Sequence, residues 1–443
     1  MFLTGFAALA VVPMLPVAAR ELDGVPLYPL VAGCFVAASL FGGVLGGDWA
    51  DRSGAARPLA AGVVLAVITL VVSATSTSIW QLAAGRFLDG VAAGMIAVAI
   101  NTAIAHAYPD RLRARALALM STCWIIPSLA GPPLAGLVAA WWSWRVVFFG
   151  LAALTVIPSL IVVLQLRGRS WKAENAGGTG KAEPEGEGEG EGEARPRPPL
   201  LVAAAVSVGA ALAQFGVSGW NLTHLLCGAA GLALLVVCVP RLLPAGVWRA
   251  ARGLPATVLL RAMTSGAYFT LEAFVPLLLN TVRRVPPVQT GLAFTGAAIA
   301  WAGSSWLQGR LQGRVARHRL VTAGALVMGA SVALAAAGTL PALPAQTAAA
   351  AMVLAAVGMG MAAPSLTLLS LTHSPPGRQG YASSAMQTSQ NLGQMAVMAV
   401  AAAVFNLVLA GGSADPAAYA AAFGLLLVPS VLAATLAVRA RGE

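Results

Sequence analysis

Charged residues are scarce in this sequence. Asp, Glu, Lys and Arg make up 10% of the 443 residues, and hydrophobic residues make up 58%. A soluble globular domain has about a quarter of its residues charged, so a water-soluble surface over the whole chain is excluded. The mean hydropathy of +0.80 agrees with that exclusion. We therefore expect a polytopic membrane protein, and the net charge of +11 does not indicate nucleic-acid binding, because the basic residues lie in short loops between apolar runs.

Cysteine, histidine and catalytic motifs are also sparse. The four cysteines lie within apolar runs and the four histidines are scattered, so no metal site is predicted and the cysteines are interpreted as packing residues. The sequence has no H-E-x-x-H, no G-x-S-x-G and no G-x-x-x-x-G-K-[ST] motif. A membrane-embedded enzyme would need such a constellation. We expect no enzyme activity and no cofactor.

Long apolar runs occupy most of the chain. Runs of about 17–25 residues are long enough to cross a bilayer as helices, and the sequence predicts fourteen of them. Helix is expected throughout, because a helix satisfies its own backbone groups inside lipid. Arginines concentrate in alternate loops, which predicts that both termini are cytoplasmic. The expected fold class is an all-α polytopic protein of the cell inner (plasma) membrane.

Residues 167–198 differ from the rest of the chain. They contain a Glu-Gly repeat that has no apolar face and repels itself, so a disordered cytoplasmic linker is expected there. The linker separates a predicted six-helix bundle at 1–166 from two inserted transmembrane helices and a cytoplasmic loop at 199–255. A second six-helix bundle is predicted at 256–443.

A polar segment at 47–57 interrupts the apolar runs and is expected to form a tight turn between two helices. Its pattern, G-x-x-x-D-R-x-G-x-x-R, resembles the signature loop of the major facilitator superfamily of transporters, which lies on the cytoplasmic side between spans two and three. A weaker copy of the same glycine and arginine hairpin occurs at 309–317. The residues that match the pattern are Gly47, Asp51, Arg52, Gly54 and Arg57. We expect these residues to act in conformational switching, with Asp51 able to accept hydrogen bonds at a helix N-terminus.

A glycine- and proline-rich stretch lies late in the fifth predicted span. Gly131, Pro132, Pro133 and Gly136 are similar to the core of the antiporter motif of that superfamily, which occurs mainly in exporters. Where the motif has an additional glycine, this chain has Pro127. Glycines and prolines inside a helix permit bending and close contact between helices.

The fourth predicted span carries two charged residues, Arg86 and Asp89. The stretch is similar to the family's span-four motif, in which Arg86 matches the arginine and Asp89 stands where glutamine is common. The two residues are at i and i+3 and are able to pair. Charged groups within a membrane are costly and usually functional, so the pair is a candidate for proton coupling. The alternative is a static ion pair.

Glu272 is the only acid in the ninth predicted span. Burial in the membrane disfavours its charged form, as a proton carrier requires. Tyr268, Phe269 and Phe274 lie nearby and are candidate substrate-cavity residues, together with Arg261. Arg261 is about 16 Å from Glu272 along a helix, so the two cannot pair directly. The alternative is that Glu272 is a structural partner of another helix.

Within the superfamily, the chain resembles most the fourteen-span drug:proton antiporters. Those proteins often carry an aspartate in span one, where this chain has Ala7. The resemblance implies two six-helix bundles plus two inserted helices, and proton-coupled efflux of amphipathic organic compounds by alternating access. It implies protons, a small-molecule substrate and membrane lipid as partners, with no nucleic acid, in a monomer. The alternative is a proton-coupled uptake symporter for a small organic solute.

Overall fold

The computed structural model describes residues 6, 10–107, 125–168, 200–219, 221–311, 314–374, 379–408 and 415–441. Within those residues all regular structure is helical, which confirms the expected all-α class. The predicted linker at 167–198 lies outside the described residues, apart from its first two positions at the end of a helix.

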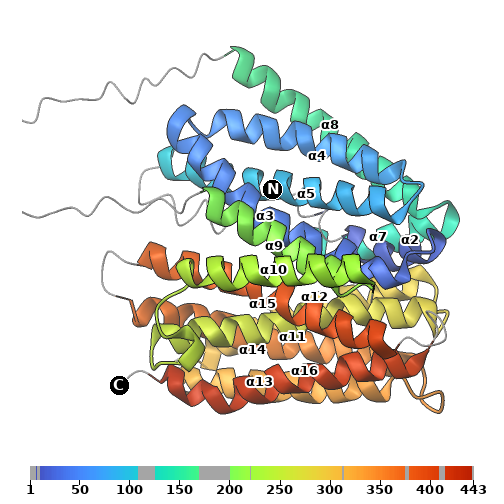
Figure 1. Ribbon diagram of the computed structural model, residues 1–443, viewed down its shortest axis with the longest axis vertical. Helices are drawn as coiled ribbons and strands as arrows, with labels where there is room; N and C mark the ends of the chain where they lie inside the picture. Colours follow the sequence, from blue (N-terminus) through green and yellow to red (C-terminus); the bar gives the residue numbers. More distant parts are fainter. Residues whose placement is uncertain are drawn as a thin grey trace, which may run out of the picture.

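The helices run back and forth across the molecule in chain order (Figure 1). Before the linker they are η1 (Val12–Met14), α2 (Leu15–Glu21), η2 (Val25–Leu27), α3 (Tyr28–Ser53), α4 (Ala56–Ala74), α5 (Ile79–Ala107), α7 (Ile125–Trp141) and α8 (Trp144–Gly168). After it come α9 (Leu200–Gly216), α10 (Leu222–Cys238), η3 (Val239–Arg241) and η4 (Val247–Arg249). The remainder are α11 (Leu254–Thr281), α12 (Pro287–Leu311), α13 (Arg317–Ala337), α14 (Gln346–Thr372), α15 (Gln379–Val408), α16 (Pro416–Leu436) and η5 (Ala437–Ala440).

Many of these helices have the length and composition of membrane spans. Within the described residues, nine helical segments are long and apolar enough to cross a bilayer. Two shorter apolar helices, Trp144–Ile157 and Leu200–Gly216, have the same character. The total of fourteen spans stays a prediction.

Two groups of helices lie on opposite sides of the molecule in Figure 1. The helices from α2 to α8, here the N-terminal group, pack on one another mainly through α3, α4 and α5. The helices from α11 to α16, the C-terminal group, pack through α11 with α15 and through α14 with α12 and α13. The two groups meet where α7 contacts α12 and where α3 contacts α15. The pair α9 and α10 joins the N-terminal group through α9, which packs on α3.

Glycines bring α3 and α5 into direct backbone contact. A Cβ atom added at Gly42 would lie 2.1 Å from the carbonyl oxygen of Val91. A Cβ atom added at Gly90 would lie 2.2 Å from the carbonyl oxygen of Phe35. No larger residue fits there, as expected where small residues let membrane helices approach closely. The two helices therefore form one closely packed unit.

Arginines gather at one end of the helices, here called the arginine-rich end. The turn between α3 and α4, the connection between α10 and α11 and the chain end after α16 all lie there. The end that carries the connections between α2 and α3 and between α11 and α12 is called the opposite end. The arginines at the first end include Arg52, Arg57, Arg241, Arg249, Arg252, Arg310, Arg314 and Arg439.

The largest buried core cluster joins the two groups toward the opposite end, and a smaller cluster joins α3 and α9 to α15. One large cluster combines residues of the N-terminal group, such as Leu15, with residues of the C-terminal group, such as Phe274. Toward the arginine-rich end, one cluster contains Val321 and Leu366 and draws on no helix of the N-terminal group. Another contains Val91 and draws only on the N-terminal group. The two groups are thus sealed together at the opposite end, whereas each group also has a core cluster of its own nearer the arginine-rich end.

The polar turn predicted over 47–57 is much shorter in the structure. Helix α3 covers Gly47 and Arg52, and only two residues, beginning at Gly54, connect it to α4. Arg52 donates to Asp48 at 2.9 Å, which supports the last turn of α3. Gly54 then ends the helix with a φ of 79°, in the region that glycine adopts without strain. The prediction of a turn over the whole segment is therefore wrong.

Candidate functional site

A carboxylate lies deep within the C-terminal group, on α11. Glu272 is half-buried, whereas its neighbours Leu271 and Ala273 are buried. None of the ion pairs among the described residues involves Glu272. Tyr268 lies one helical turn earlier, and its side chain interacts with that of Glu272. The side-chain partner of Glu272 among the described residues is thus a hydroxyl, and none of the described ion pairs gives it a cation.

Aromatic rings extend from this carboxylate toward α12. The ring of Tyr268 meets Phe269 edge to face, with centroids 5.1 Å apart. It meets Trp301 of α12 in the same way at 5.0 Å. Aromatic faces beside a carboxylate are a suitable environment for an organic cation. The structure therefore brings together three of the residues predicted from the sequence and adds Trp301.

The N-terminal group reaches the same part of α11. The hydroxyl of Tyr28, at the start of α3, donates to the carbonyl of Ala273 at 2.8 Å. This hydroxyl is close enough to interact electrostatically with Glu272. Arg20 of α2 donates to the carbonyl of Asn280, also on α11, at 2.9 Å. Glu272 thus lies where the two groups of helices are joined.

Arg261 lies on α11 nearer to the arginine-rich end. Its guanidinium donates to the side-chain oxygen of Gln390 on α15. The Nε and Nη1 atoms of Arg261 are buried and have no hydrogen-bond partner in the described residues. Two donor nitrogens of this guanidinium are thus unused among the described residues and are suited to an anionic or carbonyl group.

Phe274 belongs to the core and not to an open surface. It is fully buried, and its ring packs on Phe405 with centroids 5.4 Å apart. Phe405 packs in turn on Tyr419 at 4.9 Å. These rings belong to the core cluster that the two groups share toward the opposite end.

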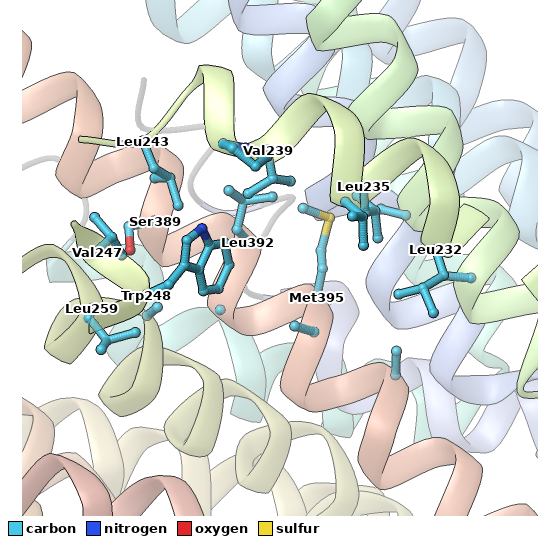
Figure 2. A pocket seen from close by; sticks show the side chains of 18 residues that line it. Leu232, Leu235, Val239, Leu243, Val247, Trp248, Leu259, Ser389, Leu392 and Met395 are labelled. Atoms are coloured by element: carbon cyan, nitrogen blue, oxygen red, sulfur yellow. The ribbon is translucent and has the colours of Figure 1, made fainter. Parts of the chain in front are cut away.

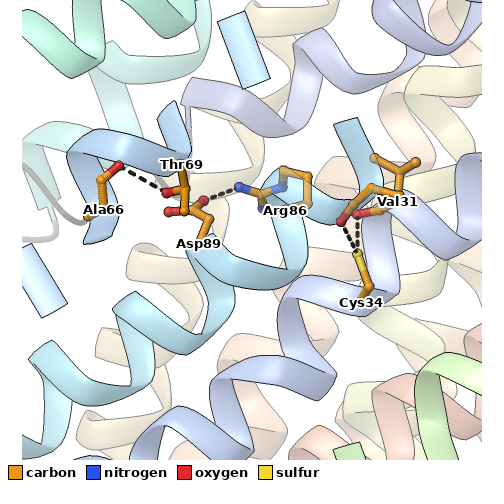
Figure 3. Close-up of polar contacts among 7 residues, drawn as sticks. Val31, Cys34, Ala66, Thr69, Arg86 and Asp89 are labelled. Carbon is orange, nitrogen blue, oxygen red and sulfur yellow. Dashed lines mark hydrogen bonds and ion pairs between the residues drawn. The ribbon is translucent and has the colours of Figure 1, made fainter. Parts of the chain in front are cut away.

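Arg86 and Asp89 form the ion pair expected from their spacing (Figure 3). Both are buried, with 3% and 9% of their surfaces exposed. The guanidinium of Arg86 also lies over the ring of Phe35 on α3, 4.3 Å from its centroid. Thr69 of α4 lies beside Asp89 in Figure 3 and interacts with it. Each of these partners belongs to the N-terminal group, so this arrangement fits a fixed ion pair within that group.

The two prolines in α7 leave one carbonyl oxygen of that helix free to accept a hydrogen bond from the C-terminal group. Pro132 and Pro133 both lie inside α7. Pro133 has no N–H, so the carbonyl of Leu129 one turn earlier has no intrahelical donor. The hydroxyl of Thr295 on α12 donates to that carbonyl at 2.7 Å.

Glycines then hold α7 and α12 in contact. A Cβ atom added at Gly136 would lie 2.6 Å from the carbonyl oxygen of Pro287. A Cβ atom added at Gly291 would lie 2.5 Å from the carbonyl oxygen of Pro132. Gly131 has more room, since a Cβ atom there would lie 3.7 Å from Ala10. The glycine and proline stretch is therefore part of the seal at the opposite end.

The segment 47–57, which resembles the signature loop, lies at the arginine-rich end of α3 and at the start of α4. Gly47 and Arg52 are in the last turns of α3, and Arg57 is exposed at the start of α4. Asp51 falls within the same helix, but its side chain lies outside the described residues. The segment is remote in sequence and position from Glu272, so the structure does not join these two candidate regions.

Tyr28, Trp301 and Thr295 were not singled out from the sequence. All three are polar or amphipathic residues within stretches of small apolar residues, and tyrosine occurs only five times in the chain. A polar or amphipathic side chain inside an apolar stretch was the available signal. In the described part of the chain, no three His, Cys, Asp or Glu residues are grouped to hold a metal ion.

Comparison with known sequences identifies relatives over nearly the whole chain. The family model of the Major Facilitator Superfamily matches residues 1–398. A probable multidrug-efflux transporter of Mycobacterium tuberculosis is 26% identical over 437 residues, which are 96% of this chain and 88% of the relative. A multidrug resistance protein of Dickeya zeae is 29% identical over 166 residues, which are 36% of this chain and 41% of the relative.

Solved structures share the fold at low sequence identity. A peptide transporter in complex with sulfate matches with a TM-score of 0.70 and 16% identity, covering 99% of this chain and 93% of that one. A D-xylose–proton symporter matches with a TM-score of 0.65 and 15% identity, covering 100% and 96%. At such identities the likeness concerns the arrangement of helices alone.

Proposed function

Because this chain belongs to the major facilitator superfamily of membrane transporters, we propose that it exports amphipathic organic compounds in exchange for protons. The observation that carries the proposal is the position of Glu272. It is a half-buried carboxylate without a cationic partner among the described ion pairs, beside aromatic rings and at the junction of the two helix groups. A proton and an organic cation both suit such a group.

In the proposed cycle, the arginine-rich end faces the cytoplasm of a cell whose inner membrane contains the protein. Basic loops remain on the cytoplasmic side of membranes, which supports this orientation and places both termini there. The present state is then closed toward the outside, since the largest shared core lies at the opposite end. Opening of the contact between α7 and α12, with closure at the arginine-rich end, gives the outward-facing state.

Glu272 couples the two fluxes by taking either a proton or a substrate. It is protonated when the site faces outward and releases the proton when the site faces inward and substrate binds. Tyr268 holds the carboxylate in position, and the rings of Phe269 and Trp301 provide apolar contact to the substrate. Arg261 offers its two unused donor nitrogens to polar groups of the substrate.

Asp89 is the second candidate for proton coupling. Its carboxylate is already paired with Arg86 and lies against α4, within the N-terminal group. Protonation of Asp89 would leave the buried guanidinium of Arg86 without its partner, which is costly, whereas Glu272 has no cationic partner among the described ion pairs. Glu272 is therefore ranked first.

The test uses purified protein in proteoliposomes with an imposed pH gradient and a panel of amphipathic compounds. Wild-type protein is expected to move substrate against the proton flux. Glu272→Gln is expected to abolish gradient-driven transport but to retain substrate exchange without a gradient. Asp23→Asn is the matched control, since Asp23 is exposed and its φ of 49° is one that Asn tolerates.

Two results would contradict the proposal. Gradient-driven transport at the wild-type rate by the Glu272→Gln protein would show that Glu272 is not the coupling acid. Accumulation of a solute together with protons, and no exchange against them, would show a symporter that takes up a small organic solute.

A further inference from the structure

A cavity lies away from Glu272, between the inserted pair α9 and α10 and the helices α11 and α15 (Figure 2). Its volume of about 490 Å³ is in the range of small-molecule sites. Its lining is apolar apart from the Trp248 indole nitrogen and the hydroxyl of Ser389. That hydroxyl is already used, because it donates to the carbonyl of Val258 at 2.6 Å. The cavity therefore suits a hydrocarbon chain and offers almost nothing to orient a polar solute.

The cavity opens to the side of the molecule, where the membrane lies. Leu232, Val236 and Trp248 line it and are 60%, 64% and 68% exposed. In Figure 2 the side chains of α10 and α15 face each other across the space, with the ring of Trp248 near one end. An apolar cavity with a lateral opening is in direct reach of lipid chains.

Positive charge lies at the end of this cavity that is toward the arginine-rich end. Arg241 follows the lining residue Pro240, and Arg249 follows the lining residue Trp248. Both arginines are exposed, and neither takes part in an ion pair among the described residues. Basic groups between membrane helices at the cytoplasmic side are suited to lipid head groups.

The segment that carries these arginines is held in place. Arg439 of η5 donates to the carbonyl of Arg249 at 3.0 Å, and the N–H of Gly253 donates back to the carbonyl of Arg439 at 3.3 Å. Val247 is 2% exposed and belongs to a core cluster with α11 and α13. The part of the segment that carries Arg249 is thus a fixed feature of the fold.

We propose that this cavity binds an acyl chain of an anionic phospholipid from the surrounding membrane, whose phosphate is held by Arg241 and Arg249. The cavity lies between α9, which packs on the N-terminal group, and α11 and α15, which belong to the C-terminal group. The bound lipid therefore contacts both groups of helices. This inference does not depend on Glu272 or on the direction of transport.

The test measures lipid binding to delipidated protein in detergent by native mass spectrometry. Phosphatidylglycerol and phosphatidylcholine with the same acyl chains are compared, and the wild type is expected to prefer phosphatidylglycerol by about tenfold or more, from two arginines. The double variant Arg241→Gln/Arg249→Gln is expected to lose that preference. The matched control is Arg314→Gln/Arg319→Gln, which removes two exposed arginines of the same end and is expected to keep it.

A second variant fills the cavity itself. Ala396 of α15 lines the space and is exposed, so Ala396→Trp is expected to lower binding of phosphatidylglycerol while the protein elutes and melts as the wild type does. Equal binding of the two lipids by the wild type would overturn the proposal. So would an unchanged preference in the Arg241→Gln/Arg249→Gln protein. Full lipid binding by Ala396→Trp together with slower transport of a hydrophobic compound would assign the cavity to the substrate instead.

Discussion

The hydroxyl of Thr295 donates to the carbonyl of Leu129 at 2.7 Å, across the boundary between the two helix groups. That carbonyl is available because Pro133 has no N–H to offer it. The proline therefore has two effects: it interrupts the hydrogen bonding of α7 and it creates an acceptor for α12. The seal at the opposite end depends on this pair and on the glycine contacts beside it.

Removal of the Thr295 hydroxyl is expected to weaken the seal. Thr295→Val loses one interhelical hydrogen bond, about 1 kcal/mol, which changes the ratio of the two states about fivefold toward opening at that end. The measurement is the labelling rate of Ala135→Cys, a position on α7 that is 3% exposed, in a background without other cysteines. Thr295→Ser keeps the hydroxyl, so the cysteine of Ala135→Cys is expected to be labelled slowly in that background. Equal rates for the valine and serine variants would mean that the bond does not hold the seal.

Substitution of Asp89 is expected mainly to lower the stability of the folded protein. Asp89→Asn leaves the buried guanidinium of Arg86 without its partner, at a cost of about 3–5 kcal/mol. The measurement is the melting temperature in detergent, together with transport. The double variant Arg86→Met/Asp89→Asn removes the unpaired charge and is expected to recover most of the lost melting temperature. If Asp89→Asn melts as the wild type does but fails to couple transport to the proton gradient, Asp89 and not Glu272 is the coupling acid.

The orientation in the membrane is testable with single cysteines. Glu185→Cys, in the linker predicted from the sequence, is expected to react with a membrane-impermeant thiol reagent only from the cytoplasmic side. Thr77→Cys lies in the connection between α4 and α5 at the opposite end, where Thr77 is exposed, and is expected to react only from outside. The reverse pattern would invert the proposed orientation.

Asp51 is expected to affect switching between states and not substrate affinity. It lies in the last turn of α3 at the arginine-rich end, remote from Glu272. Asp51→Asn is expected to slow transport while the equilibrium binding of substrate stays nearly unchanged. Asp48→Asn is the control, since it removes only an exposed ion pair with Arg52, worth about 0–1 kcal/mol. Weak binding combined with normal turnover in the Asp51→Asn protein would contradict this role.

The sequence predicted the helical class and the local pairs because both depend on short-range patterns. Apolar runs define helices in lipid, and the spacing of Arg86 and Asp89 places them on one helix face. The extent of the turn at 47–57 was not predictable from composition. The hydrogen bond from Arg52 to Asp48 stabilises α3 through residues whose composition is typical of a polar loop.

Contacts between distant helices were beyond the sequence alone. Tyr28 is 245 residues from Ala273, whose carbonyl accepts its hydrogen bond. Nothing in either local sequence selects that partner, since the pairing follows from the way the two groups of helices meet. The same holds for Trp301 beside Tyr268 and for the cavity next to α10, which exists only when four helices are assembled.

The glycine contacts between α3 and α5 have a mechanical consequence. Helices whose backbones touch at Gly42 and Gly90 cannot slide past each other without collision, so they turn together as a stiff lever. Helix α3 has 26 residues and is about 39 Å long. A rotation of about 10° around one end moves its other end by about 7 Å over that length. A small tilt is thus amplified into a gap wide enough for a molecule, without any helix having to bend.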